Sequence, residues 1–439
     1  MNKPFAAMPK YHVYKDSGVE WLGEIPEGWE KVRFRNFFKF SKGLNITKEN
    51  LQEKGIPCVN YGEIHSKYGF EFSPEKHPLK CVSEDYLKVS PKALLQRGDF
   101  VFADTSEDIN GSGNFTQLIG DHDVFAGYHT IIARPRKSNN HRFLAYVLES
   151  ISYRNQIRQK VKGVKVYSIT KSILKNTFVW LPPRPEQKTI ADFLDRKTGQ
   201  IDAAVAIKKK QIKLLKERKQ ILIQHAVTQG LNPDAAKRDS GVEWIGEIPE
   251  GWKVKRIKFL FSIGRGRVIS QQKLDDSGSY PVYSSQTKDN GVLGYINTYD
   301  FDCQQITWTT DGANAGTVFL REGKHNCTNV CGTLQPTNNR LSLKFITNAL
   351  GVAAQFYKRP DTNGAKIMNG EMSEVFVTFP PFPEQKEIAE YIEKESAKID
   401  QAIHLNQQQI EKLNEYKTTL INSAVTGKIK IPGKLEAFS

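Results

Sequence analysis

The sequence has few cysteines and lacks a long apolar run. Its 439 residues include 5 cysteines, which are too few and too scattered for a disulfide framework. No apolar stretch approaches the ~20 residues that span a bilayer, and none follows Lys3 as a signal peptide would require. We therefore predict a cytoplasmic protein that makes no membrane contact.

Motifs for catalysis are also missing. A DNA methyltransferase needs a glycine loop for its cofactor and an Asn/Asp-Pro-Pro-aromatic site, but the double prolines stand in LPPR and FPPF, without the polar residue in front. No Walker-type GxxxxGK(S/T) segment occurs. Both PEQK segments contain the Glu-x-Lys of many nucleases, yet no Asp lies in the ten residues before either copy. These absences predict a chain with no catalytic residue and no cofactor of its own.

Metal ligands are scarce as well. His325, Cys327 and Cys331 resemble a metal cluster, but one histidine and two cysteines do not complete a tetrahedral zinc site. We interpret them as buried or incidental residues and predict no metal site.

Basic residues, by contrast, are in excess. The chain has 63 Lys and Arg against 48 Asp and Glu, which gives a net charge of +15. Such a charge favours a polyanionic partner, most commonly nucleic acid. Charge alone does not distinguish this case from a protein that is merely basic.

Two segments of the chain occur twice. A tryptophan motif, DSGVEWLGEIPEGW at 16–29, returns as DSGVEWIGEIPEGW at 239–252. LPPRPEQKTIADFLDRKTGQID at 181–202 likewise matches FPPFPEQKEIAEYIEKESAKID at 379–400, and the likeness continues to AVTQG and AVTGK. The chain is therefore an internal duplication in which each half has a tryptophan motif, a long body and a helical tail.

The duplication predicts a division into eight segments. These are an N-terminal tail, 1–15; the first tryptophan motif, 16–30; the first body, 31–180; the first helical region, 181–230; a linker with the second tryptophan motif, 231–252; the second body, 253–378; the second helical region, 379–430; and a C-terminal tail, 431–439.

Both bodies are expected to be α+β domains. Short apolar runs such as DFVFADT, HTIIARP, QQITWTT and GTVFLRE, separated by polar loops, predict strands. HRFLAYVLESISYRNQI and LSLKFITNALGVAAQFY predict helices among them. The bodies differ in sequence while their frame is shared, so we expect them to do different versions of one task.

Each helical region predicts a long helix. Pro185 and Pro383 fit the first turn, and the Glu after each faces the positive end of the helix dipole. In the first copy we predict a short helix over about 185–196, a loosening at Gly199, and a longer helix to about 228. Both copies carry a heptad seam. The seam residues are Ile201, Val205, Lys208, Ile212, Leu215, Lys219, Leu222 and Ala226, and Ile399, Ile403, Asn406, Ile410, Leu413, Lys417, Leu420 and Ala424.

Two matched seams in one chain can pair with each other. Antiparallel pairing would place one body at each end of a coiled-coil rod. Lys208 near Asn406, together with Lys219 and Lys417, would then help to fix the register. The alternative is two ordinary helices, each packed on its own domain.

The tryptophan motif offers large, rigid apolar surfaces. Trp21 and Trp29 recur as Trp244 and Trp252, and no nucleophile and base are paired within the motif. It serves either as a junction between body and rod or as a docking patch offered twice.

The polar loops of the bodies carry side chains that read base edges. Asn, Gln, Ser, Thr, Lys and Arg stand among glycines that allow close approach. Mere solvation explains any one such residue, but as sets they favour DNA recognition. The candidate DNA contacts are Lys42, Lys48, Thr105, Asn110, Ser112, Asn114, Lys162, Lys165, Tyr167, Arg265, Arg267, Tyr283, Ser284, Ser285, Gln286, Lys288, Asn314 and Lys366.

The order of these segments resembles the specificity subunit of a type I restriction–modification system. YKDSGVEWLGEIPEGW, a variable body, LPPRPEQKTIADFLD, a heptad helix and AVTQG are followed by the whole series again, which ends in AVTGK. The resemblance covers residues 11–430 and rests on the paired PP-x-x-EQ-x-x-I-A and A-V-T-G motifs. The departures are small: Gln229 is inserted in AVTQG, and Lys10-Tyr11-His12 replaces a frequent Pro-Tyr stretch.

The resemblance implies that each body is a target recognition domain for one half of a bipartite site in double-stranded DNA. It implies that the two helices form a spacer that docks two methyltransferase subunits, which carry S-adenosylmethionine and methylate adenine. Motor-nuclease subunits would use ATP and magnesium. Two other functions fit the same layout: a free-standing bipartite DNA-binding regulator, and a coiled-coil scaffold that binds no DNA.

Overall fold

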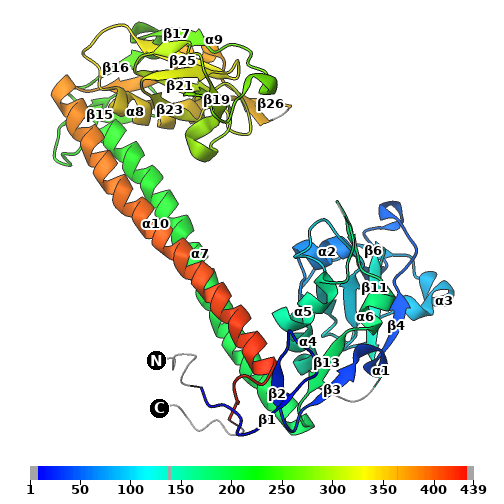
Figure 1. Ribbon diagram of the computed structural model, residues 1–439. Coiled ribbons are helices and arrows are strands. Elements are labelled where there is room, and N and C mark those ends of the chain that lie inside the picture. Colours follow the sequence, from blue (N-terminus) through cyan, green and yellow to red (C-terminus); the bar gives the residue numbers. More distant parts are fainter. Residues whose placement is uncertain (1–7, 137–139, 164, 363, 433–439) are drawn as a thin grey trace. The chain divides into compact units, whose positions relative to one another are not determined.

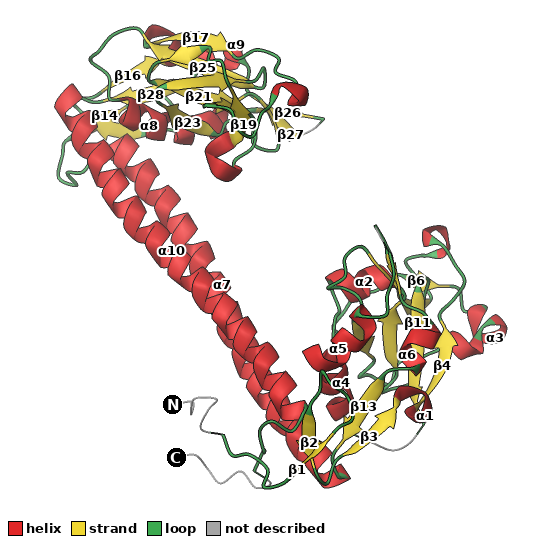
Figure 2. Cartoon of the chain, viewed as in Figure 1, coloured by secondary structure: helices red, strands yellow, loops and turns green. Residues whose placement is uncertain are grey.

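The computed structural model describes residues 8–136, 140–163, 165–362 and 364–432. The chain divides into two compact units. The first unit comprises 1–207 and 409–439, and the second comprises 208–408. Helices and strands are mixed in both (Figure 2), so the predicted α+β fold is confirmed.

The first body is built around a four-stranded antiparallel sheet (Figure 1). In spatial order its strands are β4 (Phe38–Lys42), β11 (Thr130–Pro135), β7 (Phe100–Ala103) and β9 (Phe115–Gln117). Successive residues of a strand face opposite sides. Phe100 and Phe102 accordingly join the buried cluster of α4 (His141–Glu149), while Val101 and Ala103 join that of α2 (Tyr61–Ser66).

The second body repeats this sheet. Its strands, again in spatial order, are β17 (Phe261–Arg265), β25 (Cys331–Pro336), β21 (Gln305–Thr309) and β23 (Val318–Arg321). In both bodies the last of the four strands in the chain lies between the first and the second. Residues of α8 (Leu343–Tyr357) share a buried cluster with this sheet. The four predicted runs form β7, β11, β21 and β23, and the predicted helices form α4, α5 (Ile151–Arg158) and α8. The bodies therefore share a topology although their sequences differ.

Shorter elements complete each unit. In the first unit these are β1 (Tyr14–Asp16), β2 (Glu24–Pro26), β3 (Glu30–Arg33), α1 (Phe34–Phe37), β5 (Ile56–Val59), β6 (Cys81–Val82), α3 (Tyr86–Val89), β8 (Thr105–Ser106), β10 (Phe125–Ala126), β12 (Tyr167–Ser168), α6 (Lys171–Lys175) and β13 (Phe178–Leu181). In the second unit they are β14 (Lys237–Asp239), β15 (Glu247–Pro249), β16 (Lys253–Arg256), β18 (Tyr280–Tyr283), β19 (Val292–Ile296), β20 (Phe301–Asp302), β22 (Asp311–Gly312), β24 (Lys324–Cys327), β26 (Arg359–Asp361), β27 (Gly364–Lys366), α9 (Asn369–Glu374) and β28 (Phe376–Phe379). Single 3-10 turns lie at Lys48–Asn50, Pro91–Ala93, Ile257–Phe259, Gln271–Lys273 and Lys288–Gly291.

The tryptophan motif folds as a small hairpin in both units. β1 pairs with β2, and β14 pairs with β15. Trp29 and Trp252 are buried, and each joins the cluster that contains helix residues of its own unit. This burial is what a junction between body and helix requires.

Two long helices carry the heptad seams. They are α7 (Arg184–Gln229) and α10 (Phe382–Val425). The predicted break near Gly199 is wrong, because α7 continues through it without interruption. A helical glycine costs only ~1 kcal/mol relative to alanine. Leu194 and Ile201 on either side are buried, so packing of this face outweighs the cost of Gly199.

The helices pair in antiparallel fashion within each unit. In the first unit Lys417 Nζ lies 2.7 Å from Asp202, and Val205 shares a buried cluster with Leu420. In the second unit Lys219 Nζ lies 2.7 Å from Asp400. The residues of each ion pair lie 198 positions from their counterparts in the other, so the pairing follows the duplication. Every residue of the predicted seam is buried or partly buried. No helix in the described ranges is long and apolar enough to cross a bilayer.

Candidate nucleic-acid interface

In the second body, the loops predicted to contact DNA meet at one end of the sheet. Arg265 is the last residue of β17 and pairs with Gly332 of β25. The loop that contains Asn314 joins β21 to β23 at the same end. Ser284 follows β18, and Lys366 ends β27.

Hydrogen bonds hold these loops to one another. Asn314 Nδ2 donates to Ser285 O (3.0 Å), and Thr328 Oγ1 donates to Ser284 Oγ (3.1 Å). β27 pairs with β22, which directly precedes the loop of Asn314. Segments far apart in the sequence therefore form one connected surface.

Several predicted DNA contacts of this surface already have protein partners. Arg267 and Lys366 form ion pairs with nearby aspartates, with N···O distances of 2.7 and 3.1 Å. The side-chain amide of Gln286 donates to a backbone carbonyl, and Arg265 Nε does the same. Lys288 is exposed. A base contact by Gln286 would require its present bond to break.

Arg321 is a buried residue beneath this surface that sequence reasoning missed. Its side chain is 1% exposed, and its guanidinium carbon lies 3.6 Å from the ring centroid of Tyr283 and 4.3 Å from that of Phe319. Nε donates to Thr307 Oγ1 (3.1 Å) and Nη1 donates to Asn290 O (2.7 Å). Burial lowers the pKa of Arg321. One sequence signal could have indicated it, because at strand spacing Arg321 shares a face with Phe319 in the apolar run GTVFLRE.

The first body places its predicted contacts at the corresponding end of its sheet. Lys42 ends β4 and pairs with Ile131 of β11, while residues 104–114 join β7 to β9. β8 pairs with β12, so Thr105 and Tyr167 lie on neighbouring strands, as β22 and β27 do in the second body. Lys42, Lys48, Asn110, Lys162 and Lys165 are exposed.

The side chain of Asn114 is hydrogen-bonded within the protein and that of Ser112 is buried, which does not match their prediction as DNA contacts. Asn114 Oδ1 accepts from Arg154 Nη1 (2.6 Å), and its Nδ2 donates to His65 Nδ1 (3.0 Å). His65 Nε2 in turn donates to Thr105 O (2.8 Å). Asn114 therefore holds the loop in shape. Ser112 does not fit the prediction, because its side chain is 0% exposed and cannot reach a base unless the loop moves.

The group that resembled a metal cluster consists of buried residues. His325 Nδ1 donates to Gly323 O (2.8 Å), and Gln305 Nε2 donates to His325 Nε2 (2.8 Å). Burial raises the pKa of Cys331 to about 11 and raises that of Cys327 further. Both thiols are therefore protonated at neutral pH, and within the described ranges no group of three acidic, His or Cys side chains is arranged to hold a metal ion.

Comparisons with known proteins agree with this layout. The family model of the type I restriction modification DNA specificity domain matches residues 26–217 and 249–415. A Mycoplasma pneumoniae protein named as the N-terminus of a putative type I specificity subunit is 41% identical over 138 residues, which are 31% of this chain and 74% of that protein. The MpnII restriction enzyme specificity subunit of the same species is 36% identical over 138 residues, but these span only 42% of its length.

A solved structure supports the fold. A chain from a structure of the complex assembly of a type I R-M system superposes with a TM-score of 0.69 at 15% identity. The match covers 91% of this chain and 98% of that one. Since the family model matches most of the chain in two successive copies, the chain belongs to the family of the type I restriction modification DNA specificity domain.

Proposed function

We propose that this chain is the DNA specificity subunit of a type I restriction–modification complex, and that each body reads one half of a bipartite site. One observation carries the proposal. Each body has a four-stranded sheet of the same topology, and connected polar loops lie at the corresponding end of each sheet. The side chains of these loops differ between the two bodies. Equal scaffolds with different loops suit two readers of different sequences.

The electrostatics support nucleic acid as the ligand. The chain carries a net charge of +15, and lysines of both bodies stand exposed at these ends, including Lys42, Lys165 and Lys288. Exposed lysines bind phosphates without reading sequence, so they would supply affinity and position. The polar loop residues beside them would supply specificity.

The catalytic steps belong to partners in this proposal. Two methyltransferase subunits would bring S-adenosylmethionine, and motor-nuclease subunits would bring ATP and magnesium. The paired helices would dock the methyltransferase subunits and set the gap between the two half-sites. Purified chain alone should then transfer no methyl group to DNA.

An exchange of bodies tests the proposal. Lys253 of β16 pairs with Phe379 of β28, so the second body begins and ends on paired strands. These two positions are suitable junctions for an exchange. Replacing 253–378 with the corresponding body of a relative should change one half of the methylated motif. The half read by the first body, which closes through the matching pair of Glu30 with Leu181, serves as the internal control.

Sequencing of methylated positions, with the methyltransferase subunits present, gives the result. A change confined to one half supports independent readers. A change in both halves, or in neither, would contradict the assignment of one half-site to each body.

A further inference from the structure

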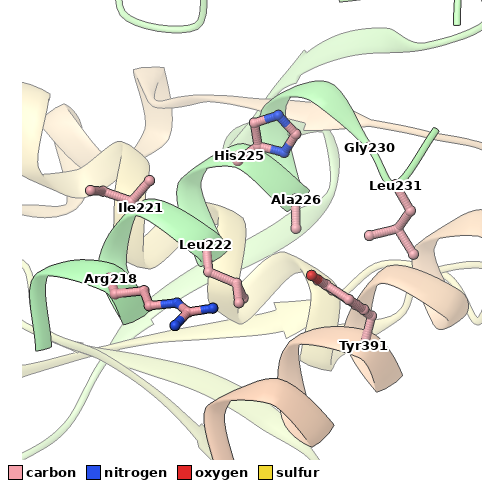
Figure 3. Close-up of a pocket in the computed structure, with 8 residues that line it drawn as sticks. All are labelled: Arg218, Ile221, Leu222, His225, Ala226, Gly230, Leu231 and Tyr391. Atoms are coloured by element: carbon pink, nitrogen blue, oxygen red, sulfur yellow. The ribbon is translucent and has the colours of Figure 1, made fainter. Parts of the chain in front are cut away.

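The second unit contains an open groove at the end of the paired helices, to which the proposed function assigns no occupant. It lies where α7 ends beside α10, and its volume is about 380 Å³. Leu222, Ala226, Leu231 and Tyr391 form its apolar lining, and Arg218 and His225 complete it on the α7 side. The side chains of Leu222 and Leu231 and the ring of Tyr391 point into the same space (Figure 3).

Several large apolar side chains of this groove are exposed to solvent. Leu231 is 41% exposed and Tyr391 is 39% exposed, and neighbouring Ile221 is 67% exposed. Single exposed apolar residues need no explanation, but several around one hollow mark an interaction site. The groove is therefore a candidate for occupation by another molecule.

The internal duplication supplies a counterpart of this groove in the first unit. Leu222 and His225 correspond to Leu420 and Ser423, 198 residues later, and Tyr391 corresponds to a phenylalanine. The counterparts are covered: Leu420 is 0% exposed and Ser423 is 6% exposed, whereas Leu222 is only partly buried and His225 is exposed.

The chain itself covers the counterpart. After α10 ends, the backbone N–H groups of Lys428 and Ile429 donate to Ser423 O (2.9 and 3.4 Å). Ile429 and Ile431 are 4% and 7% exposed, and they belong to the same buried cluster as Leu420. Phe193, the counterpart of Tyr391, packs against that cluster. Lys430 between the two isoleucines is exposed, so alternate side chains of residues 429–431 face the cluster.

The second unit lacks such a segment. Leu231 directly follows Gly230, whereas Lys428 and Ile429 follow Gly427; Asn232 and Pro233 come after Leu231, and Ala235 N donates to Asn232 O in a turn. No leucine, isoleucine or valine stands at positions 232–241, so this segment offers no large second aliphatic side chain to the groove.

We propose that the groove binds an extended segment of another polypeptide with two aliphatic side chains one residue apart. The segment with Ile429 and Ile431 in the first unit indicates which side chains the ligand should have. The residues that line the groove indicate its charge. Arg218 and His225 stand where the first unit has Tyr416 and Ser423. A segment with carboxylates beside its aliphatic residues complements this positive edge.

Three labelled peptides test the proposal by fluorescence anisotropy with the full chain. TGKIKIP copies residues 426–432, TGEIEIP replaces its lysines with glutamates, and TGESESP also removes both isoleucines. TGEIEIP should bind at least tenfold more tightly than TGESESP, because two buried aliphatic side chains provide most of the affinity. It should also bind more tightly than TGKIKIP, and Arg218→Glu should reverse that preference.

Variants of the chain locate the binding. Leu231→Asp and Tyr391→Ala should each weaken TGEIEIP at least tenfold, and both positions are exposed enough to tolerate the change. Leu214→Asp is the matched control, because Leu214 is 52% exposed on α7 but does not line the groove. Equal binding of TGEIEIP and TGESESP, or binding that Leu231→Asp and Tyr391→Ala leave unchanged, would overturn the proposal.

Discussion

Buried Arg321 holds one of the polar loops of the second body in place. Asp289, Asn290 and Gly291 have φ values of 48°, 53° and 81°, so three successive residues adopt the left-handed region. Each non-glycine residue there costs ~1–2 kcal/mol. The bond from Arg321 Nη1 to Asn290 O offsets part of this cost and fixes the loop that carries Gln286 and Lys288.

Arg321→Met should separate loop order from overall stability. Methionine fits between two aromatic rings and removes a buried charge, which is costly to keep in an apolar site, so overall stability should change little. The lost charged hydrogen bond, worth ~1.5–3 kcal/mol, frees the loop and should weaken specific binding of one half-site roughly tenfold. Methylation kinetics of the variant complex, on DNA substrates altered in one half-site at a time, measure the loss at each half-site. Equal loss at both half-sites would mean that Arg321 acts only on stability.

His325 should make the second unit sensitive to mild acid. Burial is the main cause that lowers the pKa of His325, and the charge of Arg321 adds to it. Below about pH 6.5 the unfolded chain therefore binds a proton that the folded chain resists, so stability falls as pH falls. His325→Gln should reduce the loss in unfolding free energy between about pH 7.5 and about pH 5.5. Urea unfolding at both pH values gives the answer, and an unchanged loss would contradict it.

At the scale of elements, one glycine ends each long helix against the tryptophan motif. Gly230 and Gly427 have φ values of 75° and 72°, which explains a glycine in AVTQG and AVTGK. A Cβ on Gly427 would lie 2.3 Å from Pro26, while one on Gly230 would lie 3.1 Å from Trp252. The two copies of the motif therefore differ in how tightly they enclose the glycine.

Alanine at these two positions should have unequal effects. Both substitutions incur the left-handed cost of ~1–2 kcal/mol. Gly427→Ala adds an overlap with Pro26 that the backbone must relieve, which typically costs a further ~1–3 kcal/mol. We expect Gly427→Ala to lower the free energy of unfolding more than Gly230→Ala, as measured by chemical denaturation. The reverse order would show that the hairpin of the first tryptophan motif moves aside freely.

Strands and helices could be predicted from sequence because their periodicity is local. The four apolar runs form sheet strands, and the heptad residues of α7 and α10 are buried or partly buried. The predicted break at Gly199 is wrong because the packing of Leu194 and Ile201 outweighs the low helix propensity of glycine. The roles of Asn114 and Arg321 depend on partners from distant strands, and no local pattern reveals such partners.

At the scale of the whole molecule, the duplication fixes how the helices are paired. Lys219 with Asp400 and Lys417 with Asp202 are the same ion pair formed twice. Exposed pairs of this kind add little stability, ~0–1 kcal/mol each, but they select one register of the seam. If the paired helices set the gap between half-sites, then changing their length without disturbing this register should change the gap.

A double deletion makes that change. Removing Ile212–Arg218 from α7 and Ile410–Tyr416 from α10 takes one heptad from each helix. Both ion pairs lie outside the deleted residues, and the seam positions continue across both junctions. At ~1.5 Å per residue the paired helices shorten by about 10 Å, which corresponds to about 3 base pairs of duplex.

The methylated motif of the double deletion should therefore have a gap shorter by about 3 base pairs. Activity should fall, because a shorter gap also rotates one half-site relative to the other about the DNA axis. Deleting Ile212–Arg218 alone is the matched control, since it shifts one helix past the other, breaks the register of Lys219 with Asp400 and should lower stability. Sequencing of methylated positions distinguishes the outcomes, and good activity at an unchanged gap would show that the helices do not set the spacing.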